Sequence, residues 1–171
     1  MQTIPYPDLA ELPEAVQRQV AALPLNIVHI LALASPEVFA AQCGLGGALS
    51  QPEPLDPALR EAVVLRVAHV SGSAYELQQH LPLARKAGLT EMQIAAIERA
   101  DYSALDPVLA ATCRFADEVI RTVEPSADAL AAVRAVLPDQ AVMNVVLLIG
   151  FFMTLARVMA VTGIPLEDNS A

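Results

Sequence analysis

The sequence contains few aromatic residues and no tryptophan. Aromatic residues make up 4% of its 171 residues, whereas hydrophobic residues in total make up 55%. The core must therefore be built from Ala, Leu and Val, a mixture that favours helices over strands. No segment shows a convincing alternation of polar and apolar residues with a period of two. We therefore expect an all-α fold, a single-domain helical bundle of about eight helices over residues 1–171.

Positive charge is also scarce. The chain has 10 Lys and Arg against 19 Asp and Glu, a formal charge of −9, and no basic run. This balance disfavours nucleic acid and anionic membranes as partners. The first seven residues have neither the basic nor the apolar region of a signal peptide. The most apolar stretch, residues 142–160, is interrupted by Asn144 and Arg157 and so lacks the ~20 apolar residues of a membrane span. We expect a cytoplasmic protein without a membrane partner.

Only two cysteines are present. Cys43 and Cys113 lie far apart in the sequence, each within a helical pattern, and they do not form a Cys-x-x-Cys pair. Nothing indicates a disulfide framework. We expect both to be structural thiols in a reducing compartment.

Local signals predict where the helices begin and end. The first helix is expected over residues 11–22, and the second, capped by Asn26, over residues 27–34. The next helix is expected to have Ser35 as its N-cap and Pro36 as its first residue, and to fray in the glycine-rich residues 44–47. Pro138 opens the long final helix, which ends at Gly163, and the last residues are expected to form a frayed acidic tail. Side chains predicted to cap further helices are Asp56, Ser73, Thr90, Asp106 and Ser126.

A polar cluster stands out on one predicted helix. Ser73, Glu76 and His80 lie at i, i+3 and i+7, and therefore share a face. Buried polar groups cost free energy unless they are paired, so the cluster indicates a functional site. The alternative is a capped helix start with Glu76 and His80 as an exposed i, i+4 pair.

Glu61 lies on the preceding helix, on a stripe with Leu65 and Ala68, and is expected to face His80. His80 is the candidate for proton transfer, because imidazole titrates near neutral pH, and Glu61 would orient it. Alternatively, Glu61 pairs with Arg66 or Arg85, or is solvated near the N-terminus of its helix, where a negative charge is favourable.

The other members of the cluster have two interpretations each. Glu76 is either a second carboxylate of the site or a partner of the helix dipole. Ser73 is an N-cap rather than a nucleophile, although it lies where a substrate could bind. Tyr75 either donates a hydrogen bond to a substrate or belongs to the core or an interface. Since Glu76 and His80 are four residues apart, the Glu-x-x-His spacing of di-iron bundles is absent, and we expect no metal and no cofactor.

The motif residues resemble a known superfamily. They are Leu55-Asp-Pro-Ala-Leu-Arg-Glu61, Gly72-Ser-Ala-Tyr75-Glu76 and His80, followed by Ala84-Arg-Lys-Ala-Gly88. This pattern resembles the carboxymuconolactone decarboxylase and alkylhydroperoxidase D superfamily over residues 55–100, and more loosely through the final helix. The resemblance implies a family-like core at about residues 55–165, with N-terminal helices from residues 1–54 packing on it.

The same resemblance implies a helical bundle that assembles as trimers or as hexamers built from dimers, with sites near subunit interfaces. The apolar stretch at residues 142–160 independently favours burial against another subunit. We therefore expect a homo-oligomer, whether dimer, trimer or hexamer.

For activity, the resemblance has two consequences. In the peroxidase branch a Cys-x-x-Cys pair precedes the histidine, and its two positions correspond here to Ser73 and Glu76. Neither side chain can cycle through a disulfide, so we expect no thiol peroxidase chemistry. The Tyr-Glu-x-x-x-His form is similar to a cysteine-less branch that includes lactone decarboxylases, although Leu77 replaces the aromatic residue often found after Glu76.

The function implied is that of an acid–base enzyme, a lyase of the carboxymuconolactone decarboxylase type, acting on a small carboxylate or lactone. Arg66, Arg85 and Arg157 are candidates for holding an anionic substrate. Two alternatives remain open: a non-catalytic oligomeric protein that binds small molecules, and a peroxidase-related member that has lost its Cys-x-x-Cys pair.

Overall fold

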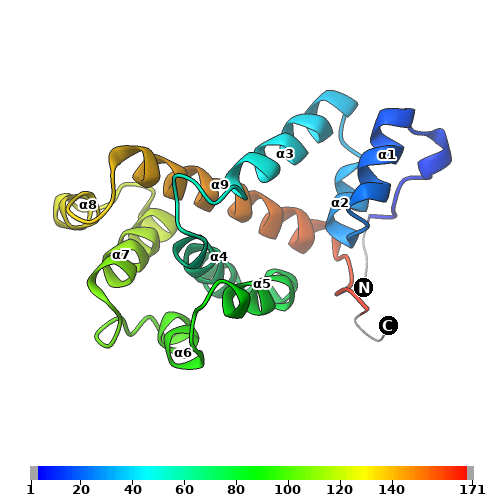
Figure 1. Ribbon diagram of the computed structural model, residues 1–171. Helices are drawn as coiled ribbons and strands as arrows, with labels where there is room; N and C mark the ends of the chain where they lie inside the picture. The colour runs from blue at the N-terminus through cyan, green and yellow to red at the C-terminus, as the bar shows by residue number, and fades with distance from the viewer. Residues whose placement is uncertain (1–3, 169–171) are drawn as a thin grey trace.

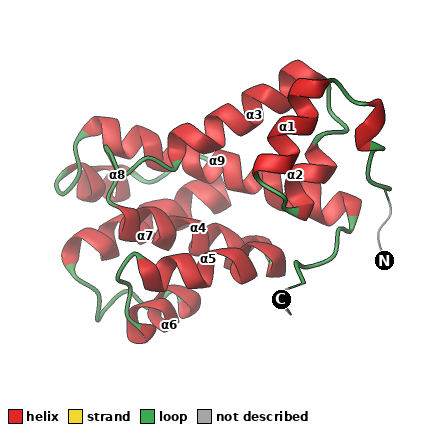
Figure 2. Cartoon of the chain, turned by 45° about the vertical axis from the view of Figure 1, so that its right-hand side comes forward, coloured by secondary structure: helices red, strands yellow, loops and turns green. Residues whose placement is uncertain are grey.

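The fold is all-helical, as predicted. The computed structural model describes residues 4–168, and within them it contains nine α-helices, one 3-10 helix (Leu9–Glu11) and no strand (Figures 1 and 2). The α-helices are α1 (Glu14–Ala22), α2 (Asn26–Leu31), α3 (Pro36–Leu49), α4 (Pro57–Ser71), α5 (Ala74–Lys86), α6 (Glu91–Arg99), α7 (Pro107–Thr122), α8 (Ala127–Arg134) and α9 (Asp139–Thr162).

Helix α4 forms the centre of the bundle. All eight of its residues from Glu61 to Ala68 are buried, so the helix is enclosed on every side. It packs against α5, α6, α7 and α9, which surround it in Figure 1. A helix that is apolar around most of its circumference requires such enclosure.

The predicted side-chain caps explain most helix starts. Ser73 accepts a hydrogen bond from the Glu76 N–H, and Thr90 forms a capping box with Gln93. Between α4 and α5, Gly72 has a φ of 64°, a left-handed conformation that glycine adopts without strain. This turn lets α5 fold back directly onto α4. The other predicted N-caps that the structure confirms are Ser35, Asp56, Asp106 and Ser126.

Several predicted boundaries in the N-terminal part were wrong. Helix α1 begins at Glu14, not at residue 11, because Pro13 occupies its N-cap position. Asn26 is the first residue of α2 and does not cap it. Instead, its side-chain amide donates hydrogen bonds to the carbonyls of Pro165 and Leu166. The cap prediction failed because the C-terminal segment, distant in sequence, engages this amide.

Helix α3 does not fray in its glycine-rich segment but continues to Leu49. Gly46 lies directly against the Phe151 ring of α9, and a Cβ at this position would lie 2.8 Å from the ring carbon Cζ. The glycine therefore permits close packing of α3 on α9, and this tertiary contact compensates for the weak helix propensity of the segment.

Helix α9 crosses the whole molecule and contacts α2, α3, α4, α7 and α8 (Figure 1). By length and composition it could span a membrane, but the core helix of a bundle passes the same test. Only 33% of its most apolar window is buried. Met143 and Leu147 are 58% and 46% exposed, so α9 presents apolar side chains on the outside of the chain.

Alanine substitutions at two glycines of α3 test the contact with α9. Gly44→Ala should raise the free energy of unfolding by about 0.5–1 kcal/mol, because alanine is the better helix former and nothing lies within 4 Å of the added methyl. Gly46→Ala should gain less or lose stability, because the Phe151 ring must move. Urea denaturation of both variants measures the difference. Equal gains would contradict the close packing of α3 on α9.

Candidate functional site

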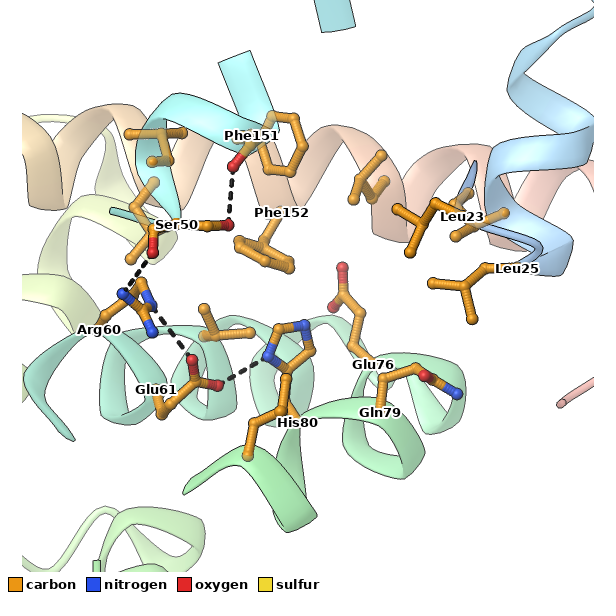
Figure 3. A pocket seen from close by; sticks show the side chains of 18 of the residues that line it. Leu23, Leu25, Ser50, Arg60, Glu61, Glu76, Gln79, His80, Phe151 and Phe152 are labelled. Carbon is orange, nitrogen blue, oxygen red and sulfur yellow. Dashed lines mark hydrogen bonds and ion pairs between the residues drawn. The ribbon is translucent and has the colours of Figure 1, made fainter. Parts of the chain in front are cut away.

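A cavity of about 700 Å³ lies between α2, α3, α4, α5 and α9 (Figure 3). Its walls are mainly apolar and come from both the N-terminal helices and the central bundle. They include Leu25, Ile27, Val28, Leu31, Val64, Leu148, Phe151, Phe152, Leu155 and Met159. A group of polar side chains from α4 and α5 also borders the cavity: Arg60, Glu61, Tyr75, Glu76, Gln79 and His80. A cavity of this size and lining suits a small organic molecule.

Glu61 and His80 form the hydrogen bond that the sequence predicts. His80 Nδ1 lies 2.8 Å from Glu61 Oε2, and both side chains are largely buried. Because a carboxylate only accepts, this contact assigns the proton to Nδ1. Within residues 4–168 no side chain hydrogen-bonds to His80 Nε2, so that nitrogen can accept a proton from a ligand. The ring also packs edge-on against Phe152, with centroids 4.9 Å apart.

Arg60 completes a chain of polar contacts and was missed by the sequence analysis. Its Nε donates to Glu61 Oε1 over 3.2 Å, and its Nη1 donates to the carbonyls of Ser50 and Gln51. Figure 3 shows Arg60, Glu61 and His80 connected in this order. Consecutive helical residues normally diverge, so spacing alone does not indicate this pair.

The arginines that the sequence analysis suggested do not line the cavity, and that prediction was wrong. Arg66 is buried in an ion pair with Asp117, at 2.8 Å. Arg85 pairs with Glu91 at the surface. Arg157 is exposed and donates to the Met153 carbonyl of its own helix. Each of these guanidinium groups therefore serves another part of the fold.

Glu76 is the least compensated polar group of the cavity. The residue is 2% exposed, and neither carboxyl oxygen has a hydrogen-bond partner within the described part of the chain. Its carboxyl group points into the space beside His80 and Phe152 (Figure 3). Burial raises the pKa of Glu76 to about 8, although the nearby Ser73 hydroxyl acts in the opposite direction. The interpretation of Glu76 and His80 as an exposed pair was therefore wrong.

Ser73 and Tyr75 have structural partners. Ser73 caps α5 and does not border the cavity. Tyr75 borders the cavity, but its hydroxyl donates to the Glu167 carboxylate and accepts from the Ile27 N–H at 3.3 Å. Burial and the Glu167 carboxylate raise the pKa of Tyr75. Their roles in substrate binding remain predictions.

The sequence analysis assigned Glu167 to a frayed acidic tail. For the tail residues that the structure describes this prediction was wrong, and residues 169–171 lie outside the described part. The Glu167 carboxylate also accepts from the Asn26 N–H, and its backbone exchanges two hydrogen bonds with the Gln78 side chain. The C-terminal segment thereby connects α2 to α5 beside the cavity.

The two thiols are poorly suited to redox chemistry at neutral pH. Burial raises the pKa of Cys113 to about 12, and it also raises the pKa of Cys43. Both favour the neutral thiol over the nucleophilic thiolate. Within residues 4–168, no three His, Cys, Asp or Glu side chains are grouped so as to hold a metal ion.

Comparison with known proteins agrees with this fold and motif. The model of the carboxymuconolactone decarboxylase family matches residues 36–118. The AhpD-core, peroxidase-related protein from Ralstonia eutropha JMP134 superposes with a TM-score of 0.84 at 20% identity, covering 98% of this chain and 93% of that one. These matches support the resemblance to the carboxymuconolactone decarboxylase and AhpD-like superfamily. No curated protein matches the sequence.

Two further solved structures share this fold. One is ATU0492 from Agrobacterium tumefaciens, a protein of unknown function proposed to be an antioxidant defence protein AhpD, with a TM-score of 0.72, 24% identity, and coverage of 81% of this chain and 96% of that one. The other is a cysteine-to-alanine variant of the debrominase Bmp8 in complex with 2,3,4-tribromopyrrole, with a TM-score of 0.79, 16% identity, and coverage of 98% and 93%. At these identities the likeness establishes the fold alone.

The buried Glu76 carboxyl group makes stability depend on pH. The unfolded chain ionises this group near pH 4.5, whereas the folded chain retains the proton to about pH 8. The contribution of Glu76 to the free energy of unfolding is therefore fully present below pH 4.5 and is lost as pH rises through about 8. Glu76→Gln should be more stable than the wild type above neutral pH, by several times the ~1.4 kcal/mol that one pKa unit represents.

Urea unfolding between about pH 4 and pH 9 measures this difference. Glu37→Gln is the matched control, because Glu37 is exposed in the first turn of α3 and its variant should follow the wild-type curve. Parallel pH curves for Glu76→Gln and the wild type would show that Glu76 ionises in the folded protein as it does in the unfolded chain.

Proposed function

We propose that this protein is an acid–base enzyme that moves a proton on a small lactone or related carbonyl compound. The observation that carries this proposal is the Glu61–His80 pair, 2.8 Å apart at the border of a mainly apolar cavity. Within the described part of the chain, this imidazole borders the cavity and has a ring nitrogen without a side-chain partner.

In the proposed mechanism, His80 Nε2 removes a proton from the carbon next to a carbonyl group and later returns it. Nδ1–H donates to Glu61 throughout, so that the carboxylate stabilises the imidazolium formed in the first step. Arg60 holds Glu61 through its second oxygen and fixes the orientation of the pair. Glu76 supplies a second carboxyl group on the same side of the cavity.

A lactone fits this cavity better than a free carboxylate does. Apart from the engaged Arg60, the cation that borders the cavity is Lys86, which is exposed at the end of α5. The debrominase structure supports a small ring as the ligand, since that protein, of the same fold, holds tribromopyrrole. The substitution of both thiol positions, by Ser73 and Glu76, favours acid–base over thiol peroxidase chemistry.

Exchange of carbon-bound hydrogen in D₂O tests the chemistry without knowledge of the product. A panel of small lactones is incubated with the protein, and proton NMR follows loss of the signal next to the carbonyl. His80→Gln should abolish exchange, because glutamine forms hydrogen bonds but cannot transfer a proton. Glu61→Gln should slow it by roughly 10²–10⁴-fold. Ser73→Ala is the control and should cost about 1 kcal/mol of stability with little effect on the rate.

An inactive Ser73→Ala with an active His80→Gln would discard this mechanism and indicate a serine nucleophile. Binding of panel members with no exchange in any variant would instead support the non-catalytic binding protein.

We further propose that the protein works as a cytoplasmic homo-oligomer, without nucleic-acid or membrane partners. The exposed apolar side chains of α9 support this proposal, as do Val38 and Leu45 on α3, which are 60% and 39% exposed. Apolar surface of this kind is stabilised by burial against a second copy.

Sedimentation velocity at micromolar concentration should yield a species heavier than the 18.1 kDa monomer. Met143→Lys should shift the distribution toward monomer, because it places a charge on the exposed side of α9. Lys86→Glu, a charge change at the end of α5, is the control and should leave the mass unchanged. A wild-type sample that sediments as monomer alone would contradict the proposal.

A further inference from the structure

The largely buried acidic and basic side chains that border the cavity have partners within residues 4–168, with one exception. Glu61 accepts from both His80 and Arg60. Arg60 in turn donates to two backbone carbonyls, which leaves little capacity for an anionic ligand. The exception is Glu76, whose two carboxyl oxygens are buried without a partner and point into the cavity (Figure 3). A buried group of this kind is costly unless a ligand provides the missing contact.

We propose that the cavity selects an electrically neutral, mainly apolar ligand, whose carbonyl oxygen accepts a hydrogen bond from the Glu76 carboxyl group. This inference rests on the proposed function only for the choice of the cavity as the site. It does not require the proposed proton transfer, because binding measurements alone can test it. It names the substrate class that the catalytic pair would act on.

The physical argument concerns the cost of removing charge from water. An anion in this cavity would lose its hydration and find apolar walls, a carboxyl group and no available buried cation. A neutral carbonyl compound loses far less hydration and gains a donor. The raised pKa of Glu76, about 8, keeps that donor protonated at neutral pH. The same group would repel a carboxylate once it ionised.

Other titratable groups border the cavity and must be separated from Glu76 in any pH experiment. They come from three of the surrounding elements: Cys43 on α3, Arg60 and Glu61 on α4, and Tyr75, His80 and Lys86 on α5. From α2 and α9 the bordering residues are apolar. His80 lies beside Glu76 in the cavity, so variants of both residues are needed.

Three probes of nearly equal shape test the proposal: 2-acetylnaphthalene, 2-naphthoate and 2-isopropenylnaphthalene. They present a neutral carbonyl, a carboxylate and an alkene at the same position. Binding is measured by naphthalene fluorescence and calorimetry, in the absence of turnover. The ketone should bind the wild type about tenfold more tightly than naphthoate and roughly fivefold more tightly than the alkene near pH 6.5.

The pH dependence identifies the donor. Ketone affinity should fall as pH rises through about 8, when Glu76 loses its proton. Glu76→Gln keeps a donor at every pH, so it should retain the ketone preference and lose the pH step. Glu76→Leu should bind ketone and alkene equally. His80→Gln should keep both the preference and the step.

Three results would overturn the proposal: naphthoate binding as tightly as the ketone, ketone and alkene binding equally to the wild type, or a pH step that persists in Glu76→Gln. Absence of binding by all three probes would likewise overturn it. Failure of the exchange experiment would remove the catalytic function and leave this binding inference intact, so the two can be judged separately.

Discussion

Burial of two opposite charges on one helix constrains the arrangement of the whole bundle. Helix α4 is enclosed on all sides, yet it carries Glu61 and Arg66, which are 3% and 2% exposed. Charges in such surroundings are tolerated only when other groups compensate them. Compensation of Arg66 comes from Asp117 of α7 and from the Ile97 and Glu98 carbonyls at the end of α6. The neighbours of α4 must therefore lie where their polar groups meet these two side chains.

The charges of Arg66 and Glu61 are compensated to different degrees. Arg66 stabilises the packing of the bundle, whereas Glu61 belongs to the candidate site. The Arg66 contacts are internal, with Tyr102 adding a hydrogen bond to the same Asp117 carboxylate. Five residues earlier on α4, Glu61 contacts one ring nitrogen of His80, and within residues 4–168 no side chain hydrogen-bonds to the other. Glu76 beside it has no partner in the described structure. Incomplete polar satisfaction in an otherwise well-packed protein is expected where a ligand binds.

The side chains of α5 restrict the chemistry that is open to this chain. With cysteines at two positions before the histidine, the helix could support thiol redox reactions. Here Ser73 caps the helix and Glu76 enters the cavity, while both remaining thiols are shifted away from the thiolate form. The chain retains the helix, the histidine and its glutamate partner, a combination suited to proton transfer on a small molecule.

The sequence by itself determined the helical class, the superfamily resemblance, most of the side-chain caps and the Glu61–His80 contact. These follow from short-range patterns: capping residues lie within three positions of the groups they satisfy, and one glycine turn separates the two helices of the pair. Only the tertiary structure decided that Arg60 supports Glu61, that Glu76 is buried without a partner, and that α9 closes the cavity.

The contact between Tyr75 and Glu167 shows most clearly what could not be predicted from the sequence. The two residues are 92 positions apart, and nothing in the local sequence around Glu167 distinguishes it from a solvated acidic tail. The burial and partners of such groups depend on how distant segments pack, and packing is a property of the whole chain. Helical periodicity indicates which residues share a face of a helix, but not which other segment packs against that face.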